Sequence, residues 1–350
     1  MSQAKLYSNV LVKVGVERSH LLSKDKLKAL TECKSLEEFA SGLRETIYGE
    51  KLAKVTLPYT SKGFERVFRE SLIEVNCKIV QNSPENVSPF LKAHLLKFEH
   101  ENIKTILRAA SVGLSYDEII SKIYMPVEEF LEKREIIANA AIGIHVKSVV
   151  DALRTTFYGP LLVTGLRKYE ETGSTKFFAI LLDRMFHENL GEAFKNLPKK
   201  EQKQAFFYVS MKTDSFNLSM ILRAKILNYD PHWIRMATSR NFYNVPEQTI
   251  EALLMADDFE SAFNIVKQSY YNKFFVKAEI PEETVSVAEK AFRKAILEHL
   301  KKTKIGDPFN IGTPIGFMVQ KEVEAYNLTA VSLGIEYGWK PDDILRLLFL

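Results

Sequence analysis

Acidic side chains come nearest, in this sequence, to a pattern that could do chemistry. Asp257, Asp258 and Glu260 form a cluster that, inside a helical bundle, could hold magnesium for a diphosphate substrate. The cluster directly precedes an amphipathic run, where carboxylates cap a helix and interact favourably with its dipole. Because no second acidic cluster of matching spacing is present, the pattern favours a helix cap over a metal site.

Two other patterns linked to chemistry are incomplete. The seven histidines include no His-x-x-x-His pair, and none lies near both Cys33 and Cys77, so zinc ligands are lacking. The glycines between Gly312 and Gly316 are not followed by the Lys-Ser/Thr of a phosphate-binding loop. The sequence therefore predicts no catalytic residue, no metal and no cofactor.

The composition is that of a globular protein, with 46% hydrophobic and 26% charged residues. A net charge of +4 arises from 48 basic and 44 acidic residues, which is too mixed to indicate nucleic-acid binding. The longest apolar stretch, near residues 136–146, is too short to span a bilayer. Two cysteines without CxxC spacing, and no signal peptide, predict a reducing cytoplasmic setting.

A polar motif recurs three times on apolar helical segments. Each copy has an acidic residue three positions before an asparagine: Glu99-x-x-Asn102, Asp214-x-x-Asn217 and Glu324-x-x-Asn327. The asparagines are 115 and 110 residues apart. The first two copies continue as Ile-Leu-Arg-Ala, which places Arg108 and Arg223 in register, whereas the third departs from Val331 to Gly334. The recurrence predicts three copies of one unit.

The same register extends to both sides of the asparagine. Fifteen positions after it lie Asp117, His232 and Asp342, followed two positions later by Ile119, Ile234 and Ile344. Upstream, the chain repeats Leu43-x-x-Thr46-x-Tyr48, Leu153-x-x-Thr156-x-Tyr158 and Val266-x-x-Ser269-x-Tyr271. Pro231 and Pro341 suit the first turn of a helix, so each unit is expected to end as long helix, tight turn and short helix.

Strand-like alternation is nearly absent, and amphipathic helical spacing fills the intervals between the motifs. The sequence predicts an all-α protein with three similar helical domains at residues 1–124, 125–240 and 241–350.

The repeated asparagine lies on the apolar stripe of its helix, with Phe98 and Ile106 four positions to either side of Asn102. A buried amide without partners costs about 1–3 kcal/mol, so each asparagine is expected to bond backbone within its own unit. The alternative is that the asparagines line a shared inner surface together with Glu99, Asp214, Glu324, Arg108 and Arg223.

These motifs resemble a known family. Residues 100–109 and 217–224 look like the long-helix motif of the C-subunit family of A-type and V-type ATP synthases, whose eukaryotic counterpart is the d subunit of the vacuolar ATPase. Residues 320–328 and 342–345 are similar to the C-terminal end of that family, and the Leu-x-x-Thr-x-Tyr segments match as well. Departures are the missing Ile-Leu-Arg of the third copy and Val12-Lys13, where an arginine-rich pattern is expected.

The resemblance implies a funnel of three similar helical domains around a pseudo-threefold axis. It also implies a peripheral protein on the cytoplasmic face of the cell membrane, seated on the rotor ring of proteolipid helices. Such a protein receives the D and F subunits of the central shaft and transmits torque without catalysis.

Two other functions stay open. One is a helical scaffold unrelated to the ATPase, although a repeat of about 110 residues far exceeds the roughly 20–50 residues of solenoids. The other is a helical-bundle enzyme with an anionic substrate, which would need a metal.

Overall fold

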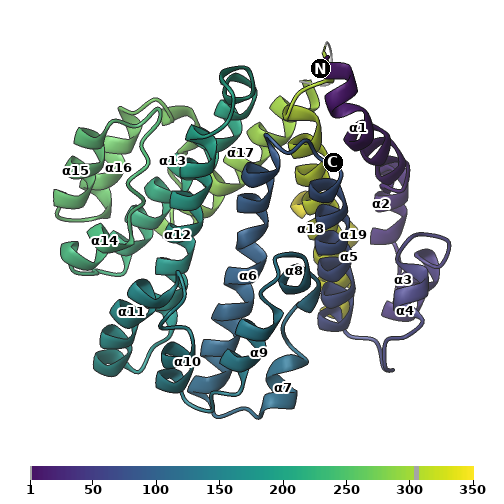
Figure 1. Ribbon diagram of the computed structural model, residues 1–350, viewed down its shortest axis with the longest axis horizontal. Coiled ribbons are helices and arrows are strands. Elements are labelled where there is room, and N and C mark those ends of the chain that lie inside the picture. Colours follow the sequence, from purple (N-terminus) through teal and green to yellow (C-terminus); the bar gives the residue numbers. More distant parts are fainter. Residues whose placement is uncertain (1, 303–306) are drawn as a thin grey trace. The chain divides into compact units, whose positions relative to one another are not determined.

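The computed structural model describes residues 2–302 and 307–350, and every regular element in these ranges is helical (Figure 1). The all-α prediction is confirmed. Its physical basis is that apolar residues spaced three and four apart can be buried together only on one face of a helix. Among the helices of these ranges, none combines the length and the apolar character that crossing a bilayer requires.

The chain divides into two compact units. Unit 1 joins the two ends of the sequence, Met1–Ser88 and Leu300–Leu350, and unit 2 is the continuous stretch Pro89–His299. The three predicted domains with boundaries after residues 124 and 240, and their arrangement as a funnel, stay predictions.

Unit 1 is built around two long helices that lie side by side, α5 and α18 (Figure 1). Its helices are α1 (Gln3–Ser19), α2 (Lys24–Thr31), α3 (Leu36–Gly42), α4 (Gly49–Leu52), α5 (Ser61–Gln81), α18 (Gly312–Glu336) and α19 (Pro341–Leu347). α5 buries Phe64 and Phe68 at helical spacing, and Phe39 of α3 packs edge-on against both, with ring centroids 5.0 and 6.2 Å away. The first and last parts of the chain thus share one core.

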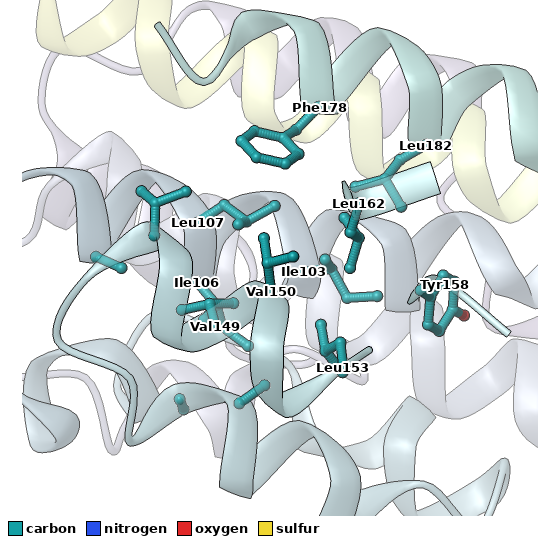
Figure 2. Packing of buried hydrophobic residues seen from close by; sticks show 14 of the residues in the cluster. Ile103, Ile106, Leu107, Val149, Val150, Leu153, Tyr158, Leu162, Phe178 and Leu182 are labelled. Carbon is teal, nitrogen blue, oxygen red and sulfur yellow. The ribbon is translucent and has the colours of Figure 1, made fainter. Parts of the chain in front are cut away.

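Unit 2 contains the helices between these two ends. They are α6 (Ser88–Ser111), α7 (Tyr116–Ile120), α8 (Met125–Phe130), α9 (Arg134–Ala141), α10 (Val146–Ala152), α11 (Gly159–Thr172), α12 (Lys176–Lys195), α13 (Lys199–Ile226), α14 (Pro231–Ala237), α15 (Glu247–Met255), α16 (Phe259–Lys267), η1 (Asn272–Phe274) and most of α17 (Pro281–Lys302). Figure 2 shows one of its apolar clusters, in which Ile106 of α6, Val149 of α10, Leu162 of α11 and Phe178 of α12 converge. The predicted apolar stripe of α6 therefore faces the core of unit 2.

The long helices α6, α13 and α18 end in the same left-handed turn. The eleventh residue after each repeated asparagine has a positive φ: Gly113 at 70°, Asn228 at 52° and Gly338 at 68°. The N–H of the next residue donates to the carbonyl oxygen five positions earlier, at 2.8 to 3.1 Å, which closes a Schellman-type cap. Glycine and asparagine adopt this conformation with the least strain. The predicted sequence of long helix, tight turn and short helix is confirmed in all three copies.

The short helices α7, α14 and α19 follow these turns, and each anchors one isoleucine in a core. Ile119, Ile234 and Ile344 are at most 1% exposed. Pro231 and Pro341 stand in the first turn of α14 and α19, as expected.

Candidate functional site

Each repeated asparagine holds a stretch of backbone 22 residues further along the chain. Asn102, Asn217 and Asn327 are at most 1% exposed, and each uses both ends of its amide. The side-chain oxygen accepts from the backbone N–H of Tyr124, Ser239 or Phe349, at 2.8, 2.9 and 2.9 Å. The side-chain nitrogen donates to the carbonyl oxygen of the same residue, at 2.9, 3.0 and 3.1 Å. We call each such pair of hydrogen bonds a clasp.

A clasp fixes the segment that leaves the short helix against the long helix that precedes it. That segment has no regular structure, so its backbone groups would otherwise be buried without partners. Two buried hydrogen bonds contribute about 1 kcal/mol each, and an orphaned donor or acceptor costs about 1–3 kcal/mol. The clasp therefore joins long helix, turn and short helix into one rigid piece.

The acidic residues of the motif are also buried, and each meets the tyrosine of another repeat. Glu99, Asp214 and Glu324 are between 0% and 5% exposed. The hydroxyl of Tyr271 donates to Asp214 at 2.9 Å, and that of Tyr48 donates to Glu324 at 2.6 Å. Tyr158 lies beside Glu99, and burial followed by the Glu99 charge raises the pKa of this tyrosine.

The order of these contacts follows the repeats. The acid of the first repeat meets the tyrosine of the second, and the acid of the second meets the tyrosine of the third. The acid of the third repeat, Glu324, meets Tyr48 of the first within unit 1. Every repeat thus supplies a long helix to one acid–tyrosine contact and a tyrosine to another.

Glu324 has a lysine as a further partner. The Lys321 ammonium lies 2.5 Å from a Glu324 carboxylate oxygen and 2.7 Å from the Tyr48 hydroxyl. The other Glu324 oxygen accepts from the N–H of Leu22 at 2.6 Å. Lys321 is 1% exposed, and burial lowers its pKa although Glu324 opposes the shift. This pair is a buried ion pair whose two charges depend on each other.

Asp214 is held by neutral donors. Its carboxylate accepts from the N–H groups of Tyr243 and Asn244, at 3.3 and 2.8 Å, besides the Tyr271 hydroxyl. Burial outweighs these donors and raises the pKa of Asp214 to about 6. The contact anchors the segment before α15 on α13.

Glu99 pairs with Lys133, whose ammonium lies 2.9 Å from one of its oxygens. Asn102 has a third hydrogen bond here, because its nitrogen also donates to Glu128 at 2.6 Å. The first repeat therefore brings two carboxyl groups, Glu99 and Glu128, into one buried cluster.

The tyrosines stand in turns that are held by the same two hydrogen bonds. The hydroxyl group of Thr46, Thr156 or Ser269 donates its hydrogen to the carbonyl oxygen three positions earlier, at 2.6 to 2.7 Å, and its oxygen accepts from the tyrosine N–H at 3.2 Å. A short side-chain hydroxyl at this position is needed to reach both groups, which explains why the motif requires Thr or Ser.

The residue that follows the tyrosine is glycine in the first two turns but not in the third. Gly49 and Gly159 bring the backbone so close to the carbonyl of Arg44 or Arg154 that an added Cβ would lie 2.0 or 1.9 Å from its oxygen. The third copy has Asn272 there and continues into η1 rather than an α-helix.

Replacing Gly49 by alanine is therefore expected to lower the free energy of unfolding by about 1–3 kcal/mol, because the backbone of the turn must move. Gly15→Ala in α1 is the matched control, since its Cβ would meet no atom within 4 Å. That change is expected to raise stability by about 0.5–1 kcal/mol. Urea denaturation of both variants measures the difference, and equal stabilities would contradict the role given to Gly49.

The two arginines of the motif lie away from the buried acids. Arg108 is exposed, and its Nε donates at 3.3 Å to the carbonyl of Lys104 on its own helix. Arg223 forms a two-point ion pair with Glu289 of α17, at 2.7 and 3.2 Å, and is 44% exposed. The structure thus brings acid and asparagine of each repeat into buried contacts but leaves both arginines at the surface.

The acidic cluster acts as a helix cap, as the sequence indicates. Asp258 precedes α16 and accepts from the N–H of Ser261 at 2.8 Å, and Glu260 pairs with Lys277 at 2.6 Å. Within residues 2–302 and 307–350, no three His, Cys, Asp or Glu side chains are grouped so that they could hold a metal ion.

Sequence reasoning missed the partners of the acids. Lys321 could have been noticed, because it lies one turn before Glu324 on the same apolar helix. Lys133 precedes α9 as Ser23 and Pro246 precede α2 and α15, but neither of these is charged, so periodicity did not point to Lys133. Glu128 lies on α8, between α7 and α9, whereas the corresponding stretch between α14 and α15 has no helix.

The structure defines an all-helical repeat protein whose recurring acids and asparagines form internal contacts. A sequence profile of the ATP synthase (C/AC39) subunit family matches residues 10–347, and the chain belongs to that family.

Relatives of this chain match it over most of its length. It is 29% identical to the C subunit of the A-type ATP synthase of Methanocaldococcus jannaschii, over 98% of this chain and 86% of the relative. The corresponding values are 27%, 93% and 82% for the C subunit of the Methanothermobacter thermautotrophicus enzyme, and 24%, 97% and 90% for that of Pyrococcus abyssi.

Proposed function

We propose that this chain is a non-catalytic subunit of the central rotor of an A/V-type ATP synthase. In this role it is a socket on the cytoplasmic face of the membrane that couples the D–F central shaft to the proteolipid ring. It transmits torque during ion-driven ATP synthesis or hydrolysis.

The observation that carries the proposal is the extent of the family match. Residues 10–347 match one family of ATP synthase subunits, and the curated relatives named above are C subunits of A-type ATP synthases that are matched over 82% to 90% of their own length. A match of this extent leaves no large segment of the chain for an unrelated activity.

The internal construction supports a mechanical role. A part that transmits torque must resist deformation, and here a clasp stiffens the end of each long helix while an acid–tyrosine contact links each repeat to another. Three quasi-equivalent repeats also suit a part that joins a ring of many subunits to a single asymmetric shaft. The acids and asparagines that recur in the repeats are used in these internal contacts.

Mixing the purified chain with the D–F shaft pair is expected to give a stoichiometric complex on size exclusion, because the proposed socket receives the foot of that shaft. The complex is expected to persist from low to moderate salt, since a large interface is only partly electrostatic. A detergent-solubilised proteolipid ring is expected to retain the chain in the same way.

Failure to bind both the shaft pair and the ring would contradict the rotor role and favour a helical scaffold unrelated to the ATPase. The enzyme alternative requires a metal, and calorimetric titration with magnesium tests it. A flat titration is expected, because the acidic cluster at Asp258 is used as a helix cap.

A further inference from the structure

Glu128 on α8 is a buried carboxyl group that the repeat pattern does not explain. It is 0% exposed. One of its oxygens accepts from the Asn102 amide at 2.6 Å, and the other has no hydrogen-bond partner among the residues that the structure describes. Burying a carboxylate in this state costs far more free energy than burying the neutral carboxylic acid.

The charges around Glu128 do not balance if it is ionised. The charge of Glu99 on α6 acts on Glu128. Glu99 is itself 0% exposed and pairs with Lys133, which precedes α9 and is 30% exposed. His100 of α6 adds no charge, because burial lowers its pKa to about 3, and Tyr158 before α11 is neutral because its pKa is raised. One lysine therefore faces two buried carboxyl groups.

The remaining charged groups nearby compensate each other. Lys104 of α6 lies 2.5 Å from Asp183 of α12, and Glu129, the neighbour of Glu128 on α8, pairs with Arg134 at 2.6 Å on the surface. Within the described part of the chain, no cation besides Lys133 lies at ion-pair distance from Glu99 or Glu128. The cluster reaches neutrality only with one proton on a carboxyl group.

The equivalent acids of the other repeats need no such proton. Glu324 is matched by Lys321, and Asp214 accepts three hydrogen bonds from neutral donors. The first repeat also differs in its clasp, since Asn102 is shared between Glu128 and the backbone of Tyr124. A movement of Glu128 therefore changes the hydrogen bonds of the first clasp directly, because both involve Asn102.

We propose that Glu128 is buried as the neutral carboxylic acid, and that this proton locks α8 and the Tyr124 segment onto α6. Loss of the proton releases the lock, because an ionised Glu128 gains hydration when α8 moves away. The short helix α8 therefore opens more readily as the pH rises. This inference does not rest on the proposed rotor function.

The direction of the pH effect follows from the two states. In the closed state burial, followed by the Glu99 charge, raises the pKa of Glu128 to about 8, from an ordinary value of 4.5. When α8 is open the group is hydrated and returns to its ordinary value. Opening therefore becomes about tenfold easier per pH unit between roughly pH 5 and 8 and levels off above that range.

Hydrogen exchange of the backbone amides of α8, measured from pH 5 to 9 and corrected for the intrinsic exchange rate, tests the lock. Protection in the unaltered chain is expected to fall about tenfold per pH unit up to pH 8. Glu128→Gln keeps an acceptor for Asn102 but cannot ionise, so its protection is expected to be independent of pH and higher than in the unaltered chain at pH 8. Glu129→Gln changes the exposed neighbour on the same helix and is expected to leave the pH dependence intact.

The same pH dependence in Glu128→Gln and in the unaltered chain would overturn the proposal. If that variant fails to fold, infrared spectroscopy of the unaltered chain decides. The carbonyl stretch of a protonated carboxylic acid is expected at pH 7 and should be lost with a midpoint near pH 8, above the range in which Asp214 titrates. Absence of such a band at pH 7 would also overturn the proposal.

Discussion

Replacing Lys321 by methionine is expected to lower the free energy of unfolding of unit 1 by about 3–5 kcal/mol. The methionine fills much of the same volume but leaves Glu324 buried without its cation, and the Tyr48 hydroxyl loses a donor. Urea denaturation followed by the fluorescence of Trp339 measures the effect, because this tryptophan belongs to unit 1. Trp233→Phe in the background removes the signal of unit 2.

Two controls test whether the lost stability comes from the ion pair itself. Lys62→Met changes an exposed lysine of α5 in the same unit and is expected to alter stability by less than about 0.5 kcal/mol. Adding Glu324→Leu to Lys321→Met removes both charges and is expected to restore part of the lost stability, since no unpaired charge then remains. A loss under about 1 kcal/mol in Lys321→Met would show that water reaches Glu324 and that the pair is not buried in solution.

Replacing Asn217 by alanine is expected to lower the free energy of unfolding of unit 2 by about 3 kcal/mol. The change removes both hydrogen bonds of the second clasp and leaves the buried N–H and carbonyl groups of Ser239 without their partner. Denaturation in a Trp339→Phe background, where Trp233 reports on unit 2, measures it. Asn264→Ala on the exposed side of α16 is the matched control and should have little effect.

The same variant tests whether the clasp takes part in binding. Because Asn217 is fully buried, its replacement is expected to weaken the fold without changing which partners the chain binds. An undiminished unfolding midpoint together with lost binding to the D–F shaft pair would contradict this, and would favour a shared binding surface lined by the repeated residues.

Much of each repeat could be predicted because its pattern is local. The turn after the long helix needs a residue that tolerates a positive φ, and Gly113, Asn228 and Gly338 stand at equal distances from the asparagines. The asparagine lies on an apolar stripe, so its need for a backbone partner also follows from the sequence alone. Both features concern residues within a few helical turns of each other.

The partners of the acids could not be predicted in the same way. Periodicity along one helix shows that Glu324 faces inward, but Tyr48 lies 276 residues away and on another element. Lys133 stands before α9, where Ser23 and Pro246 stand before α2 and α15, and Glu128 belongs to α8, which has no equivalent between α14 and α15. A repeat pattern also does not show which residues of a motif are buried. Here Arg108 and Arg223 lie at the surface and the acids do not.

The way unit 1 draws on both ends of the chain has a consequence for synthesis on the ribosome. Unit 2 is one continuous stretch, so all of its helices are available as soon as His299 has left the exit tunnel. Residues 1–88 are made before unit 2, yet α18, which packs against α5, and the Glu324 carboxylate that accepts from Tyr48 are made after it. α5 therefore lacks its long partner helix α18 until after unit 2 has been made, and residues 1–88 complete their core only then.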